Sequence, residues 1–184
     1  AASDVYKRQQ HENDREATAA DLKWLADPAE EPEPFGDGGT KMAWNTFNVV
    51  SIYPNGNPVM SDVNQRWVGD CCACAVIASM AYLYPRFVKH IIKDNMDKTY
   101  TVTMYDPKGK QISVGVGGDY FIGNSGDLGA LGGRNKEVTW ATILEKAMIK
   151  WNQIYQGSSN VGGIGTEYVS AIFTGDGESV GFGA

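Results

Sequence analysis

Histidine is scarce in this sequence, and cysteine occurs at one place only. The 184 residues include two histidines, His11 and His90, and three cysteines, all between positions 71 and 74. Neighbouring cysteines cannot build a spread disulfide framework, and the few histidines do not complete a zinc site with them. The sequence therefore predicts neither kind of cross-link, and its unpaired thiols favour an intracellular, reducing compartment.

Long apolar runs and clusters of basic residues are also missing. No run of 18 apolar residues occurs, so we expect no membrane span. The net charge is -6, and the scattered basic residues give no positive footprint for nucleic acid or for an anionic membrane surface. The length and the 42% hydrophobic content suit one ordinary globular core.

Residues 1–40 are polar and include the acidic, proline-rich run at residues 30–34. This composition is typical of an extended, solvated linker. Only residues 16–26 have apolar side chains at helical spacing, which predicts a short helix. We expect residues 1–40 to be a disordered or non-native segment, and residues 41–184 to form the folded part.

The pattern of apolar residues after position 70 predicts an α+β fold. Three- and four-residue spacing predicts helices, and alternation on both sides of a turn at residues 106–109 predicts a β-hairpin. The glycine-rich segment 117–133 lacks the residues of a phosphate loop and is expected to be a surface loop. The predicted helices cover residues 71–84, 87–92, 138–155 and 166–173, and the hairpin covers residues 99–116.

In the helix of residues 138–155 the periodicity assigns a role to each face. The apolar residues recur on one side and predict packing on a core. The charged residues Glu145, Lys146 and Lys150 lie on the other side. We expect these three side chains to face solvent.

Cys71 is the strongest candidate for chemistry. A Gly-Asp turn precedes it, and Ala73, Val76, Ile77, Met80 and Tyr84 follow at helical spacing. A thiol at a helix N-terminus ionises more readily than a free cysteine, because the helix dipole favours an anion there. Gln65 precedes this turn, and its side-chain amide is placed to form an oxyanion hole with the backbone N–H of the nucleophile.

Other interpretations of the cysteines stay open at this point. Three small apolar thiols at the start of a buried helix are equally consistent with core packing. Cys71 and Cys74 form a Cys-x-x-Cys pair, but no thioredoxin-like β-α-β pattern precedes it. His90 follows the nucleophile by some twenty residues, and a lone histidine on a mixed helix face is usually a surface or filler residue.

The residues around Cys71 resemble a known signature. The run Gln-Arg-Trp-Val-Gly-Asp-Cys at residues 65–71, followed by Ala-Val-Ile-Ala-Ser-Met at residues 75–80, is similar to the active-site motif of calpain-type cysteine proteases. The resemblance implies that Cys71 is the nucleophile and Gln65 the oxyanion donor. The family usually has Trp after the nucleophile, whereas this chain has Cys72, so one aromatic wall of the cleft is missing.

The resemblance returns near the end of the chain. Trp140, the run Leu-Glu-Lys-Ala at residues 144–147, and the pair Gly162 and Gly163 stand in the order of calpain-type cores. In such cores the paired glycines bind an extended peptide through bare backbone groups. Without the resemblance, a flexible loop is the simpler interpretation of these glycines.

The resemblance implies the N-terminal, mainly helical half of a papain-like fold. In the family, the base histidine and the asparagine that orients it lie on the other half, more than a hundred residues beyond the nucleophile. No histidine follows Gly175, and we expect the chain to be truncated at its C-terminus and inactive by itself. The expected partners are a peptide or protein substrate and the missing half.

The resemblance also raises the question of calcium, because animal calpains hold a calcium ion just before the active-site turn. Asp62 stands three residues before Gln65, as one family ligand does. Gly56 and Glu137 are each out of step with the family pattern. A calcium site needs six or more oxygen ligands, so we expect no cofactor and no tight calcium binding.

Two functions follow from the sequence. The first is a calcium-dependent-type, calpain-like cysteine endopeptidase that forms an acyl-enzyme. The second is a non-catalytic calpain-like module that binds an extended peptide or a protein, with Cys72 marking a decayed site.

Overall fold

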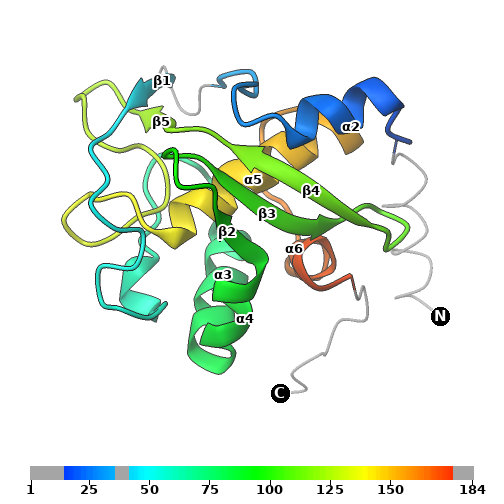
Figure 1. Cartoon of the computed structure of the whole chain (residues 1–184). Coiled ribbons are helices and arrows are strands. Elements are labelled where there is room, and N and C mark those ends of the chain that lie inside the picture. Colours follow the sequence, from blue (N-terminus) through cyan, green and yellow to red (C-terminus); the bar gives the residue numbers. More distant parts are fainter. Residues whose placement is uncertain (1–14, 36–41, 176–184) are drawn as a thin grey trace.

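The computed structural model describes residues 15–35 and 42–175, which form an α+β fold (Figure 1). The α+β class predicted from the sequence is therefore confirmed at this level. The elements within these residues are α2 Ala19–Ala26, β1 Ala43–Thr46, the 3-10 helix η1 Met60–Asp62, α3 Cys71–Leu83, α4 Pro85–Ile91, β2 Ile92–Asp94, β3 Tyr100–Tyr105, β4 Gln111–Val116, β5 Asp119–Ile122, α5 Trp140–Tyr155 and α6 Thr166–Thr174.

The larger sheet contains the predicted hairpin. Its strand order is β2-β3-β4 with antiparallel pairing throughout. Tyr100 pairs with Val116 at one end and Tyr105 with Gln111 at the other. Between them Asp106 closes the turn, because its carbonyl accepts from Gly109 N at 2.9 Å. Gly109 has a φ of +80°, a backbone angle that glycine adopts without steric cost.

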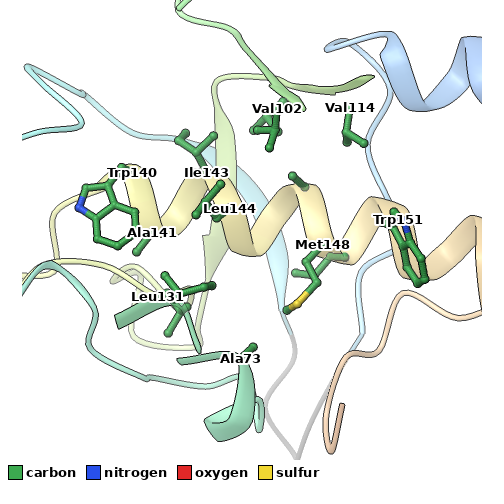
Figure 2. Close-up of a cluster of buried hydrophobic side chains, with 14 of the residues drawn as sticks. Ala73, Val102, Val114, Leu131, Trp140, Ala141, Ile143, Leu144, Met148 and Trp151 are labelled. Atoms are coloured by element: carbon green, nitrogen blue, oxygen red, sulfur yellow. The ribbon is translucent and has the colours of Figure 1, made fainter. Parts of the chain in front are cut away.

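Helix α5 lies at the centre of the core (Figure 2). Val102 of β3 and Val114 of β4 approach it from one side. On the other side lie Ala73, which belongs to α3, and Leu131 of the glycine-rich segment. All four of these side chains are fully buried. Burial of each large apolar side chain contributes about 1.5–3 kcal/mol to stability. Because α5 packs on both sides, it connects the hairpin to the helix that begins at Cys71.

The start of α5 is fixed by side-chain caps. Thr139 Oγ1 accepts from Ala141 N at 3.3 Å, and Thr142 Oγ1 accepts from Thr139 N at 3.0 Å. These bonds satisfy N–H groups that have no partner inside the helix. Trp140 Nε1 also donates to the buried carboxylate of Asp62 at 2.7 Å, which joins α5 to η1.

The prediction that the charged face of α5 is exposed to solvent is wrong. Glu145, Lys146 and Lys150 are 1%, 2% and 0% exposed. The pattern failed because α5 is covered on both sides, and buried charges need partners that periodicity does not reveal. Lys146 binds the carboxylate of Glu31 at 2.6 Å. Lys150 Nζ donates to the carbonyl oxygens of Asp27 at 2.9 Å and Gly115 at 2.8 Å.

The folded part was expected to begin near residue 41, but in the structure it includes residues 15–35. The two lysines contribute to this difference, because they bind residues of that segment. Residues 15–35 pack on α5 and β4, and Leu25 of α2 is completely buried. Gly115 permits this approach, since a Cβ there would lie 2.4 Å from the carbonyl oxygen of Ala26. The short helix predicted within residues 16–26 is confirmed as α2. Residues 1–14 and 36–41 lie outside the described part of the chain.

Three smaller details also differ from the prediction. The glycine-rich segment 117–133 contains strand β5, which pairs antiparallel with β1. The second helix ends at Ile91 and passes directly into β2. Tyr84, expected on the buried face of the first helix, is 63% exposed because α3 ends at Leu83.

The contacts of Lys150 lead to a first prediction. Lys150→Met removes the donor from the buried carbonyl group of Gly115 and from the partly buried one of Asp27, at a cost of about 1–3 kcal/mol. We expect urea unfolding to show this loss, and Lys23→Met, at an exposed position on α2, to change stability by less than about 0.5 kcal/mol. Equal stability of the two variants would contradict the anchoring role of Lys150.

Candidate active site

The loop of residues 65–71 connects η1 to α3 and carries the predicted site. Cys71 is the first residue of α3 and is exposed. Its neighbours in the loop alternate in exposure, with Gly69 exposed and Val68 and Asp70 buried. The buried residues anchor the loop, so the Cys71 thiol is presented to solvent from a fixed helix start.

The other two thiols are less available. Cys72 and Cys74 are partly buried, as expected from their positions on the helix. Burial raises the pKa of the Cys72 thiol, and neighbouring Cys71 adds to the shift. Burial also raises the pKa of Cys74, whose Sγ donates to Asp70 Oδ1 at 3.6 Å. Both thiols are therefore less readily converted to the reactive thiolate.

Gln65 lies in the same loop as Cys71. Its Nε2 donates to the carbonyl oxygen of Val68 at 2.9 Å. This bond fixes the amide group across the turn that leads to the cysteine. A side-chain amide has two N–H donors, so Gln65 can keep this contact and still donate to a second oxygen.

Gly162 and Gly163 lie beside this loop, although they follow it by more than ninety residues. The N–H of Gly163 donates to the carbonyl oxygen of Gly69 at 3.1 Å. Both glycines are exposed, and they border a hollow of about 410 Å³ that is also lined by Asn152 and Tyr168. The structure thus joins Gly163 to Gly69, the residue two positions before Cys71.

Trp67 is a further residue of the loop that sequence reasoning passed over. Its side chain is 44% exposed, and it rests on the glycine-rich segment. A Cβ at Gly123 would lie 2.6 Å from the indole nitrogen, and one at Gly129 would lie 3.0 Å from Cδ1. Trp67 therefore supplies an exposed aromatic surface near the turn, while Cys72 stands where the family has Trp.

A pair of buried acids lies beneath the helix start, and the sequence pattern had placed one of them in solvent. Asp70 and Glu145 are each 1% exposed, and each carboxyl group affects the pKa of the other. Burial raises the pKa of Asp70 to about 6 and raises the pKa of Glu145 well above its usual range. Leu131 N donates to Glu145 at 3.3 Å.

His90 is not part of this site. Helix α3 extends about 18 Å from Cys71 to Leu83 at 1.5 Å per residue, and His90 lies on α4, which follows the far end of α3 in the chain. The two helices bend by 112° at their junction, and His90 is exposed. His11, the other histidine of the sequence, lies outside the described residues.

Asp62, one of the residues considered for calcium, is held by hydrogen bonds within the protein. The Asp62 carboxylate is buried and accepts from Trp140 Nε1, from Asn55 Nδ2 at 2.8 Å and from Val59 N at 3.1 Å. Its oxygens are thus occupied by donors. Within residues 15–35 and 42–175, no group of three or more acidic, histidine or cysteine side chains is arranged to hold a metal ion.

Comparisons with known proteins identify no family for this chain, so a function can be assigned only from its motif residues. No protein-family profile matches the chain, and no curated protein matches it. In the described part of the chain, no single helix is long and apolar enough to cross a membrane, and only the bent pair α3 and α4 together meets the length and composition.

The burial of the thiols predicts their order of reactivity. Cys71 should react first with limiting iodoacetamide at neutral pH, because it is exposed and the other two thiols have raised pKa values. Peptide mapping by mass spectrometry measures the order, and Cys71→Ser should abolish the fast phase. Faster labelling of Cys72 or Cys74 would move the nucleophile to that residue.

The contacts of Asp62 predict the response to calcium. Calorimetric titration should give no micromolar binding, because replacing three donors by a metal ion requires breaking the contacts that join η1 to α5. Glu137→Gln provides the matched variant for the other candidate ligand. Micromolar binding that disappears in Glu137→Gln or Asp62→Asn would show that these carboxylates bind the ion.

Proposed function

We propose that this chain is the N-terminal, mainly helical half of a calpain-like cysteine endopeptidase with a papain-like fold. Cys71 is the nucleophile, Gln65 is the oxyanion donor, and Gly162 and Gly163 bind the substrate backbone. The observation that carries the proposal is the bond from Gly163 N to Gly69 O at 3.1 Å. It joins two motifs that are far apart in the sequence into one surface.

The arrangement suits acyl transfer to a thiol. The sulfur of Cys71 attacks the carbonyl carbon of a peptide bond, and negative charge develops on the carbonyl oxygen. The Gln65 amide and the backbone N–H of Cys71 are the donors for that oxygen. The exposed backbone of Gly162 and Gly163 offers hydrogen-bonding groups to an extended peptide, since no Cβ obstructs its approach.

Efficient turnover also needs an imidazole. A histidine holds the thiolate as an ion pair and protonates the leaving amine, and an asparagine or aspartate orients it. His90 is exposed on α4, the helix that follows α3 in the chain. We therefore propose that the base and its orienting residue come from a C-terminal half, which would close the cleft opposite Cys71.

A second function is a non-catalytic module that binds an extended peptide or protein. Cys72, in place of the family's Trp, is the observation that favours it. The two functions differ in the C-terminal half, because a histidine and an asparagine in family spacing favour the enzyme and their absence favours the module. They also differ in the effect of Cys71→Ala, which abolishes hydrolysis but leaves peptide binding in place.

Activity assays test the enzyme directly. This chain alone should not cleave a fluorogenic peptide library, whereas the chain joined to its C-terminal half should, because the imidazole then reaches the sulfur. In the joined protein, Cys71→Ala should abolish hydrolysis. Gln65→Ala should lower kcat by about a hundredfold or more, the usual loss for one oxyanion donor.

Cys72→Ser is the matched control, because it removes a neighbouring thiol and leaves the proposed nucleophile intact. We expect it to keep hydrolysis within a few fold of the parent protein. Cleavage by this chain alone, or full activity of the joined protein without Cys71, would rule out the proposed mechanism.

A further inference from the structure

The contact between α3 and α5 places two carboxyl groups together without a cation. Asp70 immediately precedes Cys71, and Glu145 projects from the middle of α5. Both side chains are almost completely buried. Cys74 donates to Asp70, and the N–H of Leu131 donates to Glu145. The backbone of Asp70 also acts on its own carboxyl group.

Two neighbouring carboxylates without a cation cannot both stay ionised in a buried site, because repulsion and lost hydration both oppose it. Asp70 Oδ2 provides a separate geometric indication. It is buried and has no hydrogen-bond partner among the described residues. A proton on Glu145 would supply the missing donor, since a carboxylic acid donates through its O–H.

We infer that Asp70 and Glu145 share one proton across the α3–α5 contact at neutral pH, and that Glu145 is thereby a positioning residue for the Cys71 thiol. The positioning role rests on the proposed function, whereas the shared proton does not. The bond from Glu145 to Asp70 fixes the residue immediately before α3. It therefore holds the sulfur of Cys71 in one place relative to Gln65 and to Gly163.

The titration of the pair determines whether the stability of the protein rises or falls with pH. Burial raises the pKa of Asp70 from 3.8 to about 6 and raises that of Glu145 above 4.5. The folded state thus keeps protons that the unfolded chain has released. The stability from the pair is complete below the ordinary carboxyl pKa values and is lost as the pH rises through about 6 and beyond.

Other groups also face the pair. Cys74 has a raised pKa because of burial and the nearby Asp70, so it stays protonated at neutral pH. Cys71 lies on the same helix turn and interacts with Cys74. The Leu131 N–H does not titrate. No lysine, arginine or histidine of the described residues acts on either carboxyl.

The first test compares the pH dependence of unfolding in this chain and in Glu145→Gln. The glutamine amide donates to Asp70 at every pH and holds no titrating proton. We measure the unfolding constant of both proteins between pH 5.5 and 7.5. The ratio of the parent's constant to that of Glu145→Gln should increase about tenfold for each pH unit, which is the effect of one proton. Glu33→Gln, at an exposed position, should keep the parent slope.

The second test measures positioning through the thiols, without any peptidase activity. Glu145→Gln should keep the preference of iodoacetamide for Cys71, because the bond to Asp70 is retained. Glu145→Ala leaves Asp70 buried without its partner, so the helix start should loosen and Cys74 should label at least several-fold faster. Glu145→Ala can be unstable, and Asp70→Asn then serves as the second conservative variant, expected to label like Glu145→Gln.

Equal pH slopes of the parent chain and Glu145→Gln would overturn the shared proton. Unchanged labelling in a folded Glu145→Ala protein would overturn the positioning role. If the slope and the labelling follow expectation but the chain joined to its C-terminal half does not cleave peptides, the proposed peptidase function fails and the shared proton stands. The two conclusions are therefore tested separately.

Discussion

The burial of α5 on both sides is the constraint on which the rest of the structure depends. The hairpin strands β3 and β4 pack on one side of this helix, and α3 and Leu131 pack on the other (Figure 2). Its charged residues must therefore find partners inside the protein. Lys146 and Lys150 bind the segment of residues 24–31, and Glu145 meets Asp70. The same helix thus holds the N-terminal segment and the turn that carries Cys71.

The candidate site follows from this arrangement. Helix α3 is fixed against α5 by Ala73 and by the Asp70–Glu145 contact, so Cys71 is exposed on a rigid support. Helix α6 packs on α3, and the loop before α6 brings Gly163 to Gly69. Rigid elements position reactive groups more accurately than free loops do. We propose that a surface formed in this way receives an extended peptide beside the thiol.

Much of the fold was predictable because its helices and its hairpin have clear periodicity. The prediction of α3, α5, α6 and the β3–β4 hairpin needed only the spacing of apolar residues. The environment of Glu145, Lys146 and Lys150 was not predictable, because periodicity cannot say that a second layer covers the polar face. Strand β5 was missed since its four residues lie among glycines. The contact of Gly163 with Gly69 is a tertiary contact that no local pattern contains.

The central claim is that Gln65, Cys71 and the pair Gly162 and Gly163 form one substrate-binding surface. A crystal structure of the chain joined to its C-terminal half, with a peptide aldehyde bound, tests it most directly. The account predicts a bond from the aldehyde carbon to Cys71 Sγ, with its oxygen about 2.7–3.1 Å from Gln65 Nε2, and peptide backbone bonded to Gly162 or Gly163. An adduct on Cys72 or Cys74, or a peptide bound away from the glycines, would contradict it.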